Sequence, residues 1–261
     1  MGVDPDVEKE GHVKGSLNSL TQNQIKNINN QMKNCVCKII YKKESGTGFF
    51  CRIPFPDNYT LLPVLITCYH VLNEKHISKG KTIKFMIDNK PKSLYMDESR
   101  MVYTYKFKDI TLIEIKRNDN INLEYFLDVD KNLNNNENYD SYIYMPVYIL
   151  HFENGKEQRY SEGVILEIKG SGIIGHYKFF YSCSTDKGSS GGPIINSSNF
   201  KVIGLHHGYK KSKDLNEGTL IGNTIKEFYS FNKNKYLSNL EHKSQIKEND
   251  DNDYRREKNN I

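Results

Sequence analysis

Short apolar runs separated by polar turns fill the chain from residue 35 to residue 222. They recur at short intervals with little helix-like spacing between them, which is typical of strands. Many short strands in succession favour barrels over a parallel sheet with crossover helices. The pattern therefore predicts an all-β fold, with strands at 35–42, 46–53, 61–67, 81–88, 99–106, 109–116, 141–152, 160–169, 172–182, 192–196, 201–207 and 217–222.

Two helices are expected at the ends of this region. Between residues 17 and 32 the apolar residues fall at a loose three- or four-residue spacing, with Thr21 or Ser19 as the N-cap, which predicts a short helix packed on the first barrel. A second helix is expected from about 224 to 232. The segment 237–261 is nearly all charged and polar, and it is predicted to be a disordered, solvated tail.

The 261 residues suffice for one domain or for two closely packed halves. A wholly polar stretch at Asn134–Asn138 indicates a linker between the halves. We therefore expect a polar N-terminal segment with a short helix, a first barrel, an inter-barrel linker, a second barrel and a charged tail. Their expected bounds are 1–34, 35–120, 121–140, 141–236 and 237–261, respectively.

Charge and hydropathy exclude several classes of partner. The chain has 37 basic and 32 acidic residues, and no cluster of Lys and Arg is interleaved with aromatic residues, so no nucleic acid is expected. No run approaches the ~18 apolar residues of a membrane-spanning helix, so no membrane is expected either. The N-terminus is charged and lacks the apolar segment of a secretory signal, which predicts a cytoplasmic protein.

The five cysteines are an odd number and lack the paired spacing of a secreted disulfide framework. They are predicted to be reduced, structural thiols. Neither they nor the eight scattered histidines show the spacing of a metal site, so no metal and no cofactor are expected. The cysteines are Cys35, Cys37, Cys51, Cys68 and Cys183.

A glycine-rich turn, Gly188-Ser-Ser-Gly-Gly-Pro193, is the strongest sign of chemistry in the chain. Its glycines indicate a sharp bend that exposes the hydroxyl of Ser190 and directs the N–H groups of Gly188 and Ser190 at one point. A nucleophile beside an oxyanion hole has this arrangement. Alone, such a sequence is more often a simple turn, so the interpretation depends on partner residues elsewhere.

His70 and Asp109 supply those partners. His70 follows the apolar run 61–66, and the end of a strand is a rigid place to hold a general base. Asp109 opens the strand-like run 110–115, where its carboxylate would accept the second imidazole N–H and fix the tautomer. Each residue alone has an ordinary structural explanation. Their joint occurrence in the order His, Asp, Ser predicts a catalytic triad with Ser190.

With these motifs the chain resembles the serine peptidases of the trypsin/chymotrypsin fold (the PA clan). GSSGGP stands for their G-D-S-G-G-P, Thr-Cys-Tyr-His70 for their histidine motif, and Asp109-Ile-Thr-Leu for their aspartate motif. The resemblance implies a chymotrypsin-like pair of six-stranded antiparallel β-barrels with the site between them. It also implies Ser190 as nucleophile, His70 as base, Asp109 as orienting acid, and an oxyanion hole formed by Gly188 and Ser190.

Two positions depart from the family pattern. Zymogen-activated members carry Asp where this chain has Ser189, and secreted members usually carry Cys where it has Val71. The resemblance then implies an intracellular enzyme whose site forms without activation cleavage.

The resemblance also implies pocket walls at Ser184, Thr185, His206, Gly208 and Gly218. Trypsin-like members have an acid where this chain has Ser184, so Lys or Arg before the cut is disfavoured. Thr185 and His206 are similar to the Thr and His that receive Glu or Gln in glutamyl endopeptidases and in chymotrypsin-fold viral cysteine proteases. A hydroxyl and an imidazole both donate to a carboxylate or amide oxygen. A preference for small apolar or aromatic residues, with His206 only packed, is the alternative.

These expectations combine into a monomeric serine endopeptidase that cleaves a protein or peptide substrate through an acyl-enzyme. The alternative is a catalytically silent protease-fold module that binds peptides in the same groove. The presence of all three triad residues together with Gly188 favours the enzyme, because a binding module does not need the hydroxyl.

Overall fold

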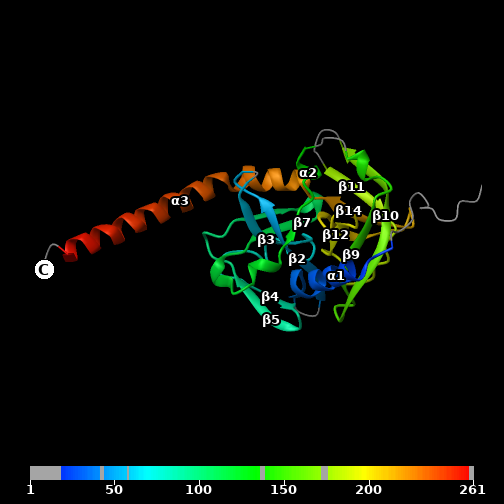
Figure 1. Cartoon of the computed structure of the whole chain (residues 1–261), viewed down its shortest axis with the longest axis horizontal. Helices are drawn as coiled ribbons and strands as arrows, with labels where there is room; N and C mark the ends of the chain where they lie inside the picture. Colours follow the sequence, from blue (N-terminus) through cyan, green and yellow to red (C-terminus); the bar gives the residue numbers. More distant parts are fainter. Residues whose placement is uncertain (1–18, 42–43, 58, 136–138, 172–175, 259–261) are drawn as a thin grey trace, which may run out of the picture.

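The computed structural model describes residues 19–41, 44–57, 59–135, 139–171 and 176–258, and for 241–258 it describes the backbone alone. Two sheets pack against each other, with a short helix, α1, near their junction and a long helix, α3, extending to one side (Figure 1).

The first sheet holds the strands of the N-terminal half, paired in the order β5-β4-β1-β2-β3-β7-β6. These pairs are antiparallel, and a short strand, β8, adds to β2 in parallel. The strands are β1 (Val36–Tyr41), β2 (Glu44–Pro54), β3 (Leu61–Thr67), β4 (Thr82–Ile87), β5 (Lys90–Tyr95), β6 (Val102–Tyr105), β7 (Ile110–Glu114) and β8 (Leu127–Asp128).

This sheet differs from the expected six-stranded barrel, because among the described residues β5 and β6 are its two edges and do not pair. The expectation also lacked β5. That strand follows β4 through Asp88 and Asn89, which both have positive φ, the conformation of a two-residue type I′ hairpin. Within β5 only Leu94 is buried, so the apolar pattern gives little sign of a strand there.

The second sheet is a closed barrel of six strands in the order β10-β11-β14-β13-β12-β9, and it confirms the expectation for this half. Together the two sheets confirm the all-β, chymotrypsin-like fold. Of the expected strand 172–182, residues 172–175 lie outside the described residues. The strands are β9 (Pro146–Glu153), β10 (Glu157–Ser171), β11 (His176–Tyr181), β12 (Pro193–Asn196), β13 (Val202–Lys210) and β14 (Leu215–Leu220).

Two apolar clusters form the core. Successive side chains of a strand point to opposite faces, and in β2 both faces are buried. Phe49 contributes to a large cluster that also includes Ile149 and Tyr181 of the second barrel. Phe50 lies in a smaller cluster formed mainly by the first sheet, with Leu65. The large cluster therefore joins the two halves and fixes how their facing edges meet.

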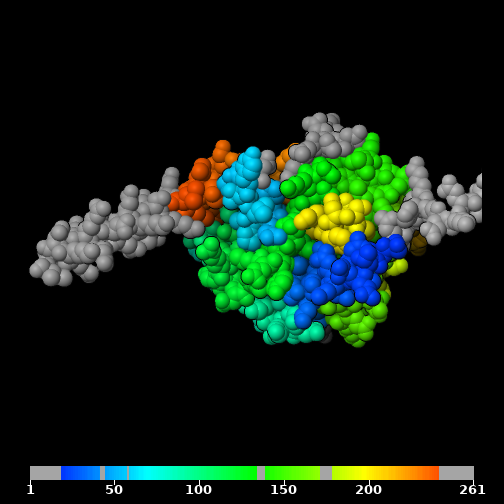
Figure 2. Space-filling model, in the orientation of Figure 1, coloured from blue at the N-terminus to red at the C-terminus, as the bar shows by residue number. Residues whose placement is uncertain are grey.

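Helix α1 (Gln22–Cys35) begins after Thr21, whose side chain accepts the N–H of Gln24 in a capping box. The expected N-cap Thr21 is thus confirmed, although the helix ends three residues later than expected. Gln31 connects it to the second barrel by donating to the Phe200 carbonyl (3.2 Å) and accepting from Tyr148 Oη (2.6 Å). Figure 2 shows α1 in blue beside the region around residue 200 in yellow. Shorter helical turns are α2 (Asn132–Asn135) and four 3₁₀ turns, Lys106–Lys108, Arg117–Asp119, Leu123–Tyr125 and Asp140–Tyr142.

Helix α3 (Gly222–Lys258) is much longer than the expected helix at 224–232. The segment from 237, expected as a disordered tail, is helical as far as Lys258 (Figure 1). No Gly or Pro follows Gly222, so no strong helix breaker ends the helix earlier, although the run 249–253 consists of Asn and Asp, which are poor helix formers. No helix in the described ranges is long and apolar enough to cross a membrane.

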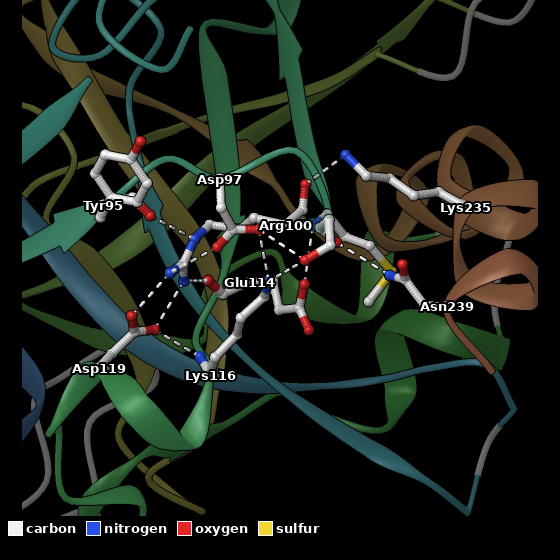
Figure 3. Close-up of polar contacts among 10 residues, drawn as sticks. Tyr95, Asp97, Arg100, Glu114, Lys116, Asp119, Lys235 and Asn239 are labelled. Carbon is white, nitrogen blue, oxygen red and sulfur yellow. Dashed lines mark hydrogen bonds and ion pairs between the residues drawn. The ribbon is translucent and has the colours of Figure 1, made fainter. Parts of the chain in front are cut away.

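A polar cluster around Arg100 attaches the middle of α3 to the first sheet (Figure 3). Arg100 is buried, and its guanidinium makes a bidentate pair with Asp119 at 2.7 and 2.8 Å. From α3, Lys235 Nζ donates to the Arg100 carbonyl at 2.7 Å, and Asn239 Nδ2 donates to the Ser99 carbonyl at 3.0 Å. The helix is therefore held to the loop that leads into β6.

Candidate active site

His70 lies in a tight turn directly after β3. The Cys68 carbonyl accepts the N–H groups of Val71 at 3.1 Å and Leu72 at 3.0 Å, so the chain bends within three residues of the end of the strand at Thr67. The bend leaves the imidazole of His70 about half exposed at the edge of a cleft. The end of a largely buried strand thus holds a solvent-accessible imidazole.

Asp109 meets His70 in two hydrogen bonds. Its Oδ1 accepts the His70 backbone N–H at 2.9 Å, and its Oδ2 lies 2.6 Å from His70 Nδ1. Burial alone would raise the pKa of Asp109, but the hydrogen bonds and charge of His70 hold it below its usual range. An ionised carboxylate at Nδ1 keeps a proton on that nitrogen and leaves Nε2 free to accept one.

The backbone at Asp109 is in the left-handed region, with φ of 51°, between a 3₁₀ turn and β7. The preceding residue anchors it: the Lys108 side chain is buried, and its Nζ lies 2.6 Å from Glu227 Oε1 in α3. Tyr103 Oη donates to the other oxygen of Glu227 at 2.6 Å, and Thr219 Oγ1 donates to the Lys108 carbonyl at 3.3 Å. Helix α3 and the second barrel therefore both restrain the position of the acid.

Ser190 lies across the same cleft, which has a volume of about 580 Å³ and is lined by His70, Gly188 and Ser190 among others. Its Oγ donates to the His207 carbonyl at 3.1 Å. Among the hydrogen bonds of the described residues, none joins Ser190 to His70. The structure thus joins the predicted base and acid directly and brings the predicted nucleophile to their cleft, with its hydroxyl turned toward β13.

The backbone around Ser190 leaves two N–H groups of the predicted oxyanion hole unpaired among the described residues. Neither the Gly188 nor the Ser190 N–H has an acceptor within the described part of the chain, so both are available to an incoming oxygen. Gly188 has a φ of +94°, and a Cβ there would lie 2.7 Å from the Phe152 carbonyl. Gly191 has a φ of +89°, and a Cβ there would lie 2.1 Å from the Thr47 carbonyl. Only glycine fits either position.

Thr47 of β2 is a positioning residue that the sequence reasoning missed. It is fully buried, its Oγ1 donates to the Gly188 carbonyl at 2.8 Å, and the same oxygen accepts the Phe152 N–H at 3.0 Å. Its own N–H donates to the Ser190 carbonyl at 2.9 Å. The only sign in the sequence is a polar residue between two glycines, Gly46-Thr47-Gly48, inside an apolar strand.

Ser189, the residue that replaces the Asp of zymogen-activated enzymes, forms a buried polar pair with His151. Ser189 Oγ lies 2.7 Å from His151 Nδ1 and donates to the Asp186 carbonyl at 2.6 Å. Burial lowers the pKa of His151 to about 4, so the ring is neutral near pH 7. Because the single hydroxyl proton of Ser189 goes to the Asp186 carbonyl, Nδ1 of this ring donates to the hydroxyl. This serine and histidine are both buried, and the pair braces the turn.

Of the predicted pocket residues, His206 has the most distinctive environment. It is buried, and its Nδ1 lies 2.7 Å from Tyr181 Oη. Burial, and then the neighbouring histidines, lower the pKa of His206 to about 3, so the ring is neutral near pH 7. Tyr181 was not among the predicted site residues, because nothing in the sequence shows that β11 and β13 bring these two side chains together.

The other predicted pocket residues surround β13 and β14. Thr185 Oγ1 donates to Asn216 Oδ1 at 2.8 Å, whereas the Ser184 side chain is exposed. Gly218 pairs with His206, and a Cβ on it would lie 2.8 Å from the Leu205 carbonyl. Gly208 has open space where a Cβ would be. Ser184 and Thr185 share a surface pocket with Tyr181, which contacts His206, but His206, Gly208 and Gly218 do not line it.

The five cysteines are free and buried, as the sequence predicts for structural thiols. Burial raises the pKa of each thiol above its usual range. Thiols of this kind are poor nucleophiles.

A family model described as the trypsin-like peptidase domain matches residues 46–205, which is more than half of the chain and includes His70, Asp109 and Ser190. The chain belongs to this family. Among curated proteins none matches it.

Solved structures support the fold of this trypsin-like peptidase domain. The Rv3671c protease of M. tuberculosis H37Rv, in its inactive form, has a TM-score of 0.52 and 18% identity over 79% of this chain and 94% of its own. A serine endoprotease from Yersinia pestis has a TM-score of 0.55 and 13% identity over 81% of this chain and 68% of its own. The HtrA-type protease AlgW, solved with a tripeptide, has a TM-score of 0.51 and 13% identity over 74% of this chain and 59% of its own.

Proposed function

We propose that this trypsin-like peptidase domain is a serine endopeptidase in which Ser190, His70 and Asp109 form the catalytic triad. The observation that carries the proposal is the contact between His70 Nδ1 and Asp109 Oδ2, at 2.6 Å, in the cleft that Ser190 also lines. This contact orients the free Nε2 of His70 as a general base.

In the proposed reaction, Ser190 Oγ turns from the His207 carbonyl toward His70 and gives its proton to Nε2 as it attacks the scissile carbonyl carbon. The oxygen of that carbonyl becomes an oxyanion, which the Gly188 and Ser190 N–H groups stabilise. His70 then protonates the leaving amine, and the acyl-enzyme forms. Water then attacks the acyl-enzyme in the same way, with His70 as base, and the acid product is released. Asp109 holds the imidazole and stabilises its positive charge throughout.

The environment of His206 favours Gln over Glu in the residue before the cut. A Glu side chain carries a negative charge, and a neutral imidazole provides a hydrogen bond but no balancing charge, so burying Glu there costs more than burying Gln. Tyr181 Oη engages Nδ1 at 2.7 Å, which leaves Nε2 as the nitrogen for the substrate. Thr185 Oγ1 donates to Asn216 Oδ1 at 2.8 Å, so it becomes the second donor of the proposed pocket only by turning away from that acceptor.

Cleavage of a diverse peptide library by wild type and by Ser190→Ala tests both the proposed peptidase activity and the proposed preference for Gln. We expect cuts after Gln well above cuts after Glu, and no cuts with Ser190→Ala. Tyr181→Phe removes the hydrogen-bond partner of His206 Nδ1. In this variant the ratio of kcat/KM for a Gln peptide to kcat/KM for the matched Glu peptide should shift toward Glu. Binding of peptides without cleavage by wild type would favour the silent peptide-binding module. Cleavage after apolar residues alone would reject the Gln pocket.

A further inference from the structure

A thiol, a carboxylate and an imidazole meet beneath the catalytic histidine. Cys68 follows β3, Asp109 precedes β7, and His207 lies in β13 of the second barrel. Their potential ligand atoms all lie within 4.8 Å of one another. The sequence gives no sign of this group, because its members are far apart along the chain and come from both sheets.

His207 is the least satisfied member. Its side chain is only 10% exposed, and its Nε2 is buried with no hydrogen-bond partner. The other ring nitrogen lies 4.0 Å from Glu217 Oε1, which is too long for a hydrogen bond. A buried polar atom without a partner costs about 1–3 kcal/mol, so the fold retains an imidazole here at a cost that a ligand would offset.

The chemistry of the three donors selects the ligand. Sulfur, nitrogen and a carboxylate oxygen are the donors that Zn²⁺ takes, whereas Mg²⁺ and Ca²⁺ prefer oxygen alone. A thiolate and a carboxylate balance the two positive charges of the ion, and the thiol proton of Cys68 leaves to solvent when it binds. Bond lengths of ~2.0–2.3 Å require the most distant donor atoms to approach by roughly 1 Å. A water molecule would complete four-fold coordination.

We propose that Cys68, Asp109 and His207 form a zinc-binding site that switches the peptidase off. Both oxygens of Asp109 are engaged by His70, at 2.9 and 2.6 Å, so a metal takes one of them only by loosening that pair. The inhibition rests on the proposed function, whereas the binding does not. Loss of the orienting acid costs about 10⁴ in kcat in a serine protease, so bound Zn²⁺ lowers kcat strongly and leaves KM nearly unchanged.

Cobalt provides a direct test, because Co²⁺ occupies zinc sites and reports its ligands by absorption. We expect the Ser190→Ala protein titrated with Co²⁺ to show a thiolate-to-cobalt charge-transfer band and the strong visible bands of four-coordinate Co²⁺. Zn²⁺ should displace both. Cys68→Ala in the same background should abolish the charge-transfer band. Cys37→Ala, another fully buried cysteine of the first sheet, should retain it.

His207→Gln gives a second route if Cys68→Ala fails to fold by circular dichroism. It should weaken Co²⁺ binding at least about tenfold, the lower end of what a change near a metal costs. Absence of the band in Ser190→Ala, its persistence in Cys68→Ala, or an unchanged affinity in His207→Gln would each overturn the site. If Ser190→Ala shows the charge-transfer band but the wild type cleaves no peptide, the zinc site stands and the proposed peptidase activity is rejected. If the wild type is active and Zn²⁺ does not change its kcat, the proposed switch is overturned.

Discussion

Thr47 Oγ1 donates a 2.8 Å hydrogen bond to the carbonyl of Gly188, so a strand of the first sheet holds the turn of the second half that carries Ser190, the proposed nucleophile. The same oxygen accepts the Phe152 N–H at 3.0 Å, and the Thr47 N–H donates to the Ser190 carbonyl at 2.9 Å. Two hydrogen bonds from one buried residue therefore hold the turn, and a third ties that residue to β9, so the turn is fixed relative to the sheet that carries His70.

Thr47→Val keeps the shape of the side chain but removes the hydroxyl, leaving the Gly188 carbonyl and the Phe152 N–H without this partner. We expect kcat to fall by about 10²–10³, comparable with loss of an oxyanion donor, because the Gly188 peptide is free to turn. KM should change much less. Steady-state kinetics on a cleaved peptide check this.

Thr47→Ser is the matched control, since it retains the hydroxyl and loses only a methyl group. Its kcat should stay within about tenfold of wild type. Equal losses in Thr47→Ser and Thr47→Val would mean that packing, and not the hydrogen bonds, explains the effect.

Glu227→Gln tests whether α3 anchors Lys108, the residue before Asp109. Lys108 is 1% exposed and Glu227 is 39% exposed, so the substitution leaves a buried ammonium without its counter-charge. We expect the free energy of unfolding to fall by on the order of 2–3 kcal/mol, less than for a fully buried pair because Glu227 is partly exposed. Urea unfolding measures the change.

Glu98→Gln is the control for that change, because Glu98 pairs with Lys79 on the surface and both side chains are largely exposed. An exposed pair contributes about 0–1 kcal/mol. If the two variants lose the same stability, Lys108 does not depend on α3.

Acid should unfold this protein at a higher pH than the protonation of its carboxylates alone would require. The pKa of His151 is about 4 and that of His206 about 3 in the fold, against 6.5 for an ordinary histidine. Between these values the unfolded chain binds more protons than the folded one, so the free energy of unfolding falls as pH drops from about 6.5 toward 4.

Each such histidine contributes up to about 1.4 kcal/mol per pH unit in that window. His151→Gln, whose amide still donates to Ser189, should therefore show a shallower decline than wild type in urea unfolding followed from pH 7 to pH 4. A stability of wild type that stays flat across this range would contradict the burial of neutral histidines.

Local signals in the sequence predict most of the strands and the three motifs of the proposed triad. His70, Asp109 and Ser190 each lie beside a strong strand or glycine signal, and all three come to the region between the sheets as expected. The contacts that cross between the two sheets have no signal in the sequence. Thr47 looks like one polar residue in a strand, and nothing nearby shows that Gly188 needs its hydroxyl.

Two other differences have local physical causes. β5 presents only one buried side chain, so a pattern of apolar residues does not detect it, and its hairpin turn, Asp88-Asn89, lacks glycine. The expected end of α3 is wrong because it rests on the small number of apolar residues beyond 237. Composition of that kind argues against packing, but it does not exclude a helix in a segment without Gly or Pro.

Labelling with a fluorophosphonate tests the central claim most directly, because this probe bonds only to a serine hydroxyl activated by a neighbouring base. The account predicts stoichiometric labelling of the wild type, located on Ser190 by mass spectrometry. It predicts no labelling of Ser190→Ala, and labelling of Asp109→Asn slowed by orders of magnitude. An unlabelled, folded wild type, or a label on Ser189, would contradict the triad of His70, Asp109 and Ser190.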